Sequence, residues 1–251
     1  MAISKFAQAY HDKMFPGYES QLLKTDPEFI ELFDNFAFDE VVNHDDLDDH
    51  TRHLAILGML LGVSGIDEFK GMLKAAYNMG VTPIEMKEIV YQATAYLGIG
   101  RVFPFLHAVN DFCQEHGIEL PLKGQSNTTP KTRLEKGIAA QVAIFGESMR
   151  DYYQSGNEDI KHINYWLTDN CFGDYYTRDG LDLRQREMIT FCFLAGLGGC
   201  HPQLIAHVGA NMRLGNDREF LIKILSHGIP FIGYPRTLNA IHCIDEACKN
   251  K

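Results

Sequence analysis

The stretch LDLRQREMITFCFLAGLGGCHPQLIAHVGANMRLG, residues 181–215, contains the pattern that decides the fold. Its apolar residues recur at spacings of three and four, the period of one helix face: Met188, Ile189, Cys192, Ala195, Leu204 and Val208. The pair Gly198-Gly199 interrupts this rhythm, which predicts two helices, 183–197 and 201–214, joined by a short turn. Since no alternating pattern of useful length occurs elsewhere, we predict an all-α protein.

A diverged repeat runs through the whole chain. Five segments recur in the same order about 135 residues later: 34–40 as 169–174, 47–52 as 181–186, 78–80 as 213–215, 98–101 as 233–236, and His107 as His242. An ordered repeat predicts two copies of one helical module. We predict an N-terminal helix and first module over residues 1–122, a polar linker at 123–132, and the second module over 133–251.

Helix ends can be placed in both copies. Thr82 and Glu85 have the spacing of a capping box, and Asp217 takes the matching cap position in the second copy. Gly80 and Gly215 stand where the preceding helices should end in a left-handed residue.

Composition excludes several classes of protein. The net charge of -10 argues against binding to nucleic acid or an anionic membrane surface, because both require a basic face. No signal peptide is evident at the N-terminus, and no run approaches the roughly 18–20 apolar residues that span a bilayer. The six cysteines show neither a CxxC pair nor zinc-finger spacing. We therefore predict a cytoplasmic protein with reduced cysteines and no metal site.

The second copy resembles the carboxymuconolactone decarboxylase family over residues 133–251, and the first copy, about 26–118, resembles a weaker version of the same module. The resemblance is carried by RLEKG at 133–137, FG at 145–146, YYTRDGLD at 175–182, REMIT at 186–190, GLGG at 196–199, His207, Gly215, GYP at 233–235 and NA at 239–240. It implies helical bundles that assemble into trimers or hexamers. It also implies two chemistries: cofactor-free decarboxylation of 4-carboxymuconolactone, or a thiol peroxidase activity like that of alkylhydroperoxidase D.

The residues predicted to be catalytic are His207, Glu187 and Cys200. Cys200, Gln203 and His207 share one helix face, and the short glycine turn would bring Glu187 on the preceding helix towards them. At the start of its helix, the dipole can lower the pKa of the Cys200 thiol. The alternative interpretation makes Cys200 a small buried apolar residue and His207 a hydrogen-bonded core histidine.

Decarboxylation requires a proton donor and a holder for carboxylates. Histidine suits the proton transfer because its ordinary pKa lies near neutrality, and the arginine fork suits carboxylates. We therefore predict His207 as general acid on a small carboxylated lactone. The expected substrate-binding residues are Arg184, Arg186, Gln203, Tyr234 and Arg236. Arg186 could instead pair with an acidic residue at the helix start.

Two other functions stay open. The peroxidase reading departs from the family pattern at Gln203, which stands in place of the second cysteine, so Cys200 would need Cys171, Cys243 or an external thiol as its partner. A non-catalytic assembly protein is the other alternative, because the first copy has lost most of the set. His53 stands there in place of Glu187 and Met72 in place of His207, so any activity is expected in the second copy.

Overall fold

The computed structural model describes residues 2–249, and within this range every regular element is a helix. This confirms the all-α prediction. The α-helices are α1 (Lys5–Met14), α2 (Leu22–Thr25), α3 (Pro27–Asn35), α4 (Asp49–Gly62), α5 (Ile66–Asn78), α6 (Pro83–Leu97), α7 (Ile99–Glu115), α8 (Arg133–Phe145), α9 (Lys161–Trp166), α10 (Leu183–Leu197), α11 (His201–Arg213) and α12 (Arg218–Lys249). Two π-helical segments, η1 (Phe36–Glu40) and η4 (Leu167–Tyr176), and two 3-10 turns, η2 (Glu147–Met149) and η3 (Tyr152–Gln154), complete the list.

The order of helices repeats between the two copies. α3 and η1 return as α9 and η4, α4 and α5 return as α10 and α11, and α6 and α7 return as the two halves of α12. The halves of α12 meet at Gly233, whose φ of 77° matches the φ of 75° at Gly98 between α6 and α7. Both junctions take a left-handed conformation that glycine adopts without strain. The two-module prediction is therefore confirmed.

The predicted helix ends are also found. Thr82 and Glu85 form both hydrogen bonds of the capping box. Asp217 accepts a hydrogen bond from the backbone N–H of residue 220 at 2.8 Å. Gly80 and Gly215 have φ of +97° and +94°, as expected of residues that end a helix.

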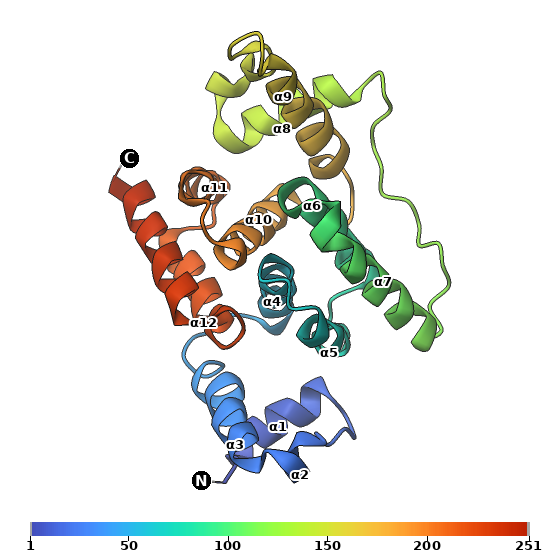
Figure 1. Cartoon of the computed structure of the whole chain (residues 1–251), viewed down its shortest axis with the longest axis vertical. Helices are drawn as coiled ribbons and strands as arrows, with labels where there is room; N and C mark the ends of the chain where they lie inside the picture. The colour runs from blue at the N-terminus through green and yellow to red at the C-terminus, as the bar shows by residue number, and fades with distance from the viewer. Residues whose placement is uncertain (1, 250–251) are drawn as a thin grey trace.

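The two copies share one hydrophobic core, at whose centre α4 crosses α10 (Figure 1). Glycines at matching repeat positions make this crossing close. A Cβ atom on Gly62 would lie 2.6 Å from the carbonyl oxygen of Phe193, and one on Gly196 would lie 2.7 Å from the carbonyl oxygen of Met59. Both obstacles are backbone atoms, so neither can move aside without separating the helices.

Gly196→Ala should therefore destabilise the chain by about 1–3 kcal/mol, the usual cost of overpacking. The matched control is Gly209→Ala in α11, where an added Cβ meets no atom within 4 Å. It should raise stability by about 0.5–1 kcal/mol, because alanine favours the helix. Urea unfolding of both variants measures the difference. Equal midpoints would contradict a close glycine contact between the copies.

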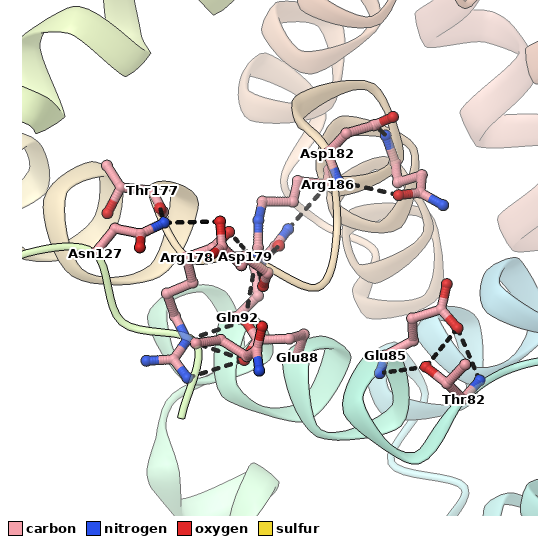
Figure 2. A network of polar contacts seen from close by, with 12 residues as sticks. Thr82, Glu85, Glu88, Gln92, Asn127, Thr177, Arg178, Asp179, Asp182 and Arg186 are labelled. Carbon is pink, nitrogen blue, oxygen red and sulfur yellow. Dashed lines mark hydrogen bonds and ion pairs between the residues drawn. The ribbon is translucent and has the colours of Figure 1, made fainter. Parts of the chain in front are cut away.

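The predicted linker is fastened to the loop that precedes α10 (Figure 2). The Asn127 side chain donates hydrogen bonds to the carbonyl oxygen of Thr177 at 3.0 Å and to Asp179 at 2.8 Å. The backbone N–H of Asp179 donates in turn to the carbonyl of Gln125 at 2.9 Å. The segment between α7 and α8 therefore contributes to fixing the start of α10, which carries Glu187. The module boundaries at 122 and 133 remain a proposal.

Candidate functional site

Glu187 and His207 form a buried pair between α10 and α11. Nδ1 of His207 donates to Oε2 of Glu187 at 2.7 Å. Glu187 is fully buried, whereas the His207 side chain keeps 9% of its surface exposed. Asn211, one turn after His207, donates to the backbone carbonyls of both residues at 2.9 and 2.8 Å. The side-chain amide of Asn211 thereby links α10 to α11 next to the Glu187–His207 pair.

A network of hydroxyl groups supports the other oxygen of Glu187. Tyr176 donates to Oε1 of Glu187 at 2.8 Å. Its oxygen has two further neighbours, the hydroxyl of Thr190 at 2.6 Å and the hydroxyl of Tyr96 at 2.7 Å. The amide of Gln92 donates to Thr190 at 2.8 Å. Every hydroxyl and amide donor in this network is satisfied if each hydrogen bond is donated towards the Glu187 carboxylate. Consecutive hydrogen bonds of this kind strengthen one another in a low-dielectric interior.

The environment keeps both tyrosines neutral. Burial raises the pKa of Tyr176 well above its ordinary value, and the nearby Glu187 carboxylate raises it further. Burial does the same to Tyr96, with Cys171, Tyr176 and Glu187 adding to the effect. The phenols are therefore hydrogen-bond donors throughout the physiological range, and their role is to hold Glu187.

His207 presents one nitrogen away from this network. Its ring lies edge-on between Tyr96 and Phe145, at centroid distances of 5.5 and 5.3 Å. Nε2 forms no hydrogen bond with any of residues 2–249. It is also not among the side-chain atoms of these residues that are buried without a hydrogen-bond partner. An imidazole held through Nδ1 and free at Nε2 can transfer a proton to a molecule that reaches this edge.

Arg186 lies at the boundary between the two copies instead of beside His207. It is completely buried and donates to Glu88 at 2.9 Å, to Gln92 at 3.0 Å and to the carbonyls of residues 178 and 179 (Figure 2). Glu88, only 1% exposed, also accepts three hydrogen bonds from Arg178. The structure thus places Arg186 in the alternative role, paired with an acidic residue near the start of its helix.

Cys200 lies apart from the Glu187–His207 pair. It precedes α11, seven residues or about 10 Å of helix before His207. Its thiol donates to the carbonyl of Leu194 at 3.4 Å and lines a hollow of about 20 Å³ together with Arg236. Burial raises the pKa of this thiol. The lowered pKa expected from the helix start is therefore wrong, because the cost of desolvation exceeds the effect of the helix end.

The remaining predicted residues lie on the surface. Arg184 donates to the side chain of Asn216 and covers the ring of Phe220. Gln203 is exposed on the first turn of α11. Tyr234 is 59% exposed at the kink of α12. Within residues 2–249, no side-chain hydrogen bond, ion pair or ring contact joins any of these three to the side chains of Glu187 or His207.

Sequence reasoning missed the groups that surround the pair. Tyr96 and Gln92 belong to α6 of the first copy, 111 and 115 residues before His207. Tyr176 and Thr190 are nearer in sequence, and both lie in segments that carry the family resemblance, at 175–182 and 186–190. A polar Gln92 within the apolar stretch of α6 was the available signal, since a fully buried amide requires partners.

The first copy holds no comparable acid–base pair at the matching place. His53 takes the position of Glu187 and Met72 that of His207, and they line a space of only about 10 Å³. Arg52, the counterpart of Arg186, donates to Nδ1 of His227 in α12 at 3.1 Å. Residue 227 is the counterpart of residue 92 in the repeat. Arg52 and Arg186 therefore form equivalent hydrogen bonds from one copy to the other.

His53 should make stability sensitive to acid. Its Nδ1 donates to the carbonyl of Asp49 at 2.7 Å, while its Nε2 is buried without a partner. Burial lowers its pKa from 6.5 to about 4. As the pH falls, the unfolded chain therefore binds this proton before the folded chain does. The contribution of neutral His53 to the free energy of unfolding is fully present above pH 6.5, and about 3 kcal/mol of it is lost as the pH falls to 4.

His53→Asn, whose amide can replace the Nδ1 donor, should flatten this dependence. Urea unfolding at several pH values between 7 and 4 measures it. The same replacement at exposed His107 should leave the slope unchanged. Identical slopes for wild type and His53→Asn would show that His53 is not the source.

Two classes of site are not found in the described part of the chain. Residues 2–249 contain no group of three His, Cys, Asp or Glu side chains that could hold a metal ion. No helix in the same range has both the length and the apolar character needed to cross a bilayer.

Comparisons with known proteins agree with this architecture. The family model described as "Carboxymuconolactone decarboxylase family" matches residues 27–111 and again residues 163–246. The 4-carboxymuconolactone decarboxylase of Acinetobacter baylyi is 31% identical over 91 residues, which cover 36% of this chain and 68% of that protein.

A solved structure from Burkholderia xenovorans LB400, assigned as a gamma-carboxymuconolactone decarboxylase subunit, has the same fold. Its TM-score is 0.56 at 19% sequence identity, and the superposition covers 97% of this chain and 98% of that chain. Two helical copies in the described structure and two matches to one family model lead to one conclusion. The chain belongs to the carboxymuconolactone decarboxylase family, as a member with two copies of the module in tandem.

Proposed function

We propose that this protein is a cofactor-free lyase that decarboxylates a small carboxylated lactone at the second copy, with His207 as the proton donor. One observation carries the proposal: Glu187 holds Nδ1 of a nearly buried histidine, whose Nε2 has no hydrogen-bond partner in the described part of the chain. A histidine that served only packing would need no fully buried carboxylate with a supporting network of hydroxyl groups.

The reaction requires little beyond positioning and one proton. The bond between carbon and the carboxylate breaks, carbon dioxide leaves, and the electron pair moves into the conjugated carbonyl of the lactone. Nε2 of His207 then gives a proton to the carbon that regains electron density, and solvent returns a proton to the imidazole. General acids of this kind typically contribute about 10²–10⁴-fold to a rate.

Glu187 positions His207 and lies on the side of the imidazole away from Nε2. Both of its oxygens are occupied, one by Tyr176 and one by His207. A protonated imidazole would therefore stand between this carboxylate and an anionic substrate. This arrangement reduces the repulsion that a carboxylate would otherwise exert on an anionic substrate.

Recognition of the substrate carboxylate by Arg184 and Arg236, with Gln203 and Tyr234, stays a prediction. Assembly into trimers or hexamers also stays a prediction, supported by large apolar side chains that both copies expose at matching positions. These are Ile99 and Phe103 on α7, and Tyr234 and Leu238 on α12, each more than half exposed. Surfaces that persist in both copies fit a contact between subunits.

A thiol peroxidase is the second candidate. Cys243 would be its resolving thiol: burial raises the pKa of Cys243, and the negative charges of Glu246 and Cys200 raise it further. Against this candidate, burial raises the pKa of Cys200 and so reduces its thiolate fraction.

One experiment separates the candidates. The purified full chain is incubated with 4-carboxymuconolactone, followed by loss of its absorbance, and separately with tert-butyl hydroperoxide and dithiothreitol. We expect lactone loss that survives Cys200→Ser. Peroxide consumption that disappears in Cys200→Ser, without lactone loss, would favour the peroxidase. Neither activity would favour a non-catalytic assembly protein.

A further inference from the structure

A cavity of about 820 Å³, lined mainly by the first copy, is not used by the lyase proposal. Its lining comes from α1, α3, α5, α7 and α12, and α1 and α3 lie at the end of the molecule opposite α8 and α9 (Figure 1). Ligand pockets in proteins typically measure about 300–1,000 Å³. The cavity is therefore large enough for a molecule of two or three fused rings.

Aromatic side chains form one continuous wall of this cavity. The ring of His11 lies 6.2 Å from that of Phe38. Phe38 meets Phe33 edge-on at 5.7 Å, and Phe33 meets Phe231 edge-on at 6.4 Å. Such a wall favours a flat aromatic ligand, because offset and edge contacts between rings add to the gain from burial.

Two polar groups in this wall lack partners. Asp34 is 8% exposed and forms no hydrogen bond or ion pair with a side chain of residues 2–249. Nδ1 of His11 is buried without a hydrogen bond; the closest carboxylate oxygen, on Asp12, is 3.8 Å away. Burial raises the pKa of Asp34, and the positive charge that His11 can carry opposes the shift.

In the second copy, the carboxylate at the matching position pairs with an arginine. Asp169, the counterpart of Asp34, forms an ion pair with Arg133 at 2.7 Å. In the first copy no arginine from residues 2–249 takes that place. A buried carboxylate without a partner is costly, and a ligand that supplies a donor removes the cost.

The charges around the cavity limit the ligand further. The lining contains more carboxylates than lysines: Asp34, Glu68, Asp111 and Glu115 against Lys70 and Lys74. A polyanion would be repelled here, so this site is unsuited to the carboxylated lactone proposed for the second copy.

From the volume, the aromatic wall and the unpartnered Asp34 carboxylate, we propose that this cavity binds an uncharged aromatic molecule with a hydroxyl group. The hydroxyl donates a hydrogen bond to Asp34, which lines the cavity. This inference does not depend on the lyase proposal.

The test is a fluorescence titration of the full chain with 2-naphthol. We expect one saturable site per chain. 2-Methoxynaphthalene, which lacks the donor, and 2-naphthoate, which carries a charge, should each bind about tenfold more weakly or worse. Asp34→Asn should weaken 2-naphthol about tenfold, because a neutral acceptor replaces a charged one, and should bring its affinity close to that of the methoxy compound.

A blocking variant provides a matched pair. Gly71 lines the cavity on α5, and a Cβ atom there meets nothing within 4 Å, so Gly71→Trp adds bulk at the cavity without a backbone clash. Gly209→Trp in α11 is equally unobstructed and lies outside the cavity. We expect the first to abolish 2-naphthol binding and the second to preserve it, with thermal midpoints measured for both.

Equal affinity for 2-naphthol and 2-methoxynaphthalene would overturn the proposal, as would unchanged binding in Asp34→Asn. Sedimentation measurements of the oligomeric state test whether the cavity is instead a contact between copies of the chain. If wild type fails to bind 2-naphthol, and Gly71→Trp converts an oligomer into monomers, the cavity is a contact between copies of the chain and the proposal is wrong.

Discussion

His207→Gln should lower kcat for the lactone about 10²–10⁴-fold with little change in KM, because the proton is transferred only in the transition state. Glutamine can still donate to Glu187 in place of Nδ1, so the buried carboxylate keeps a partner at Oε2. It cannot supply an acidic proton at the position of Nε2. Steady-state kinetics with 4-carboxymuconolactone measures both constants.

The matched control is His107→Gln on the exposed surface of α7. It should retain the wild-type kcat. Both variants should show wild-type thermal midpoints, which separates lost chemistry from lost folding. Equal kcat values for the two variants would remove His207 from the reaction.

Arg186→Met should lower the free energy of unfolding by about 3–5 kcal/mol, the usual cost of leaving one partner of a buried ion pair behind. The change deprives Glu88, Gln92 and two backbone carbonyls of a donor at once. Urea unfolding with circular dichroism measures the loss. Arg186→Lys should recover only part of it, since an ammonium group cannot reproduce the fork of a guanidinium.

Arg218→Met serves as the control, because Arg218 pairs with Asp245 at the surface. The unfolding midpoint should not move measurably, since solvent screens such pairs. Similar midpoints for Arg186→Met and Arg218→Met would show that the interface between the copies does not depend on Arg186.

The helices of the second copy were predictable because local signals determine them. The apolar period predicted helices at 183–197 and 201–214, and the structure ends the second at Arg213. Thr82 and Asp217 capped their helices as expected, because a cap depends only on residues three positions away. The crossing of α4 and α10 was not predictable, since the need for glycine at 62 and 196 arises only when the copies pack.

The candidate site was predicted in part. Glu187 and His207 meet as expected, since a short turn joins their helices. Cys200 does not join them, because two helical turns separate it from His207 and its thiol faces the carbonyl of Leu194. Tyr96 and Gln92 could not be found, since α6 reaches this site only through the packing of one copy on the other.

The role of Arg186 also depends on the packing of the two copies. The carboxylate-binding fork of arginine suggested a substrate-binding role, yet adjacent residues of a helix face different neighbours. Glu187 faces α11, and Arg186 faces Glu88 on α6. The identity of the partner element, which the sequence does not state, decided its role.

Isotope labelling in D₂O tests the central claim most directly. The product formed from the lactone should carry one deuteron at the protonated carbon, in a single configuration, because His207 delivers it from one side. The residual product of His207→Gln should carry deuterium in both configurations, since bulk solvent then supplies the proton. A single configuration formed at the wild-type rate by His207→Gln would contradict the account.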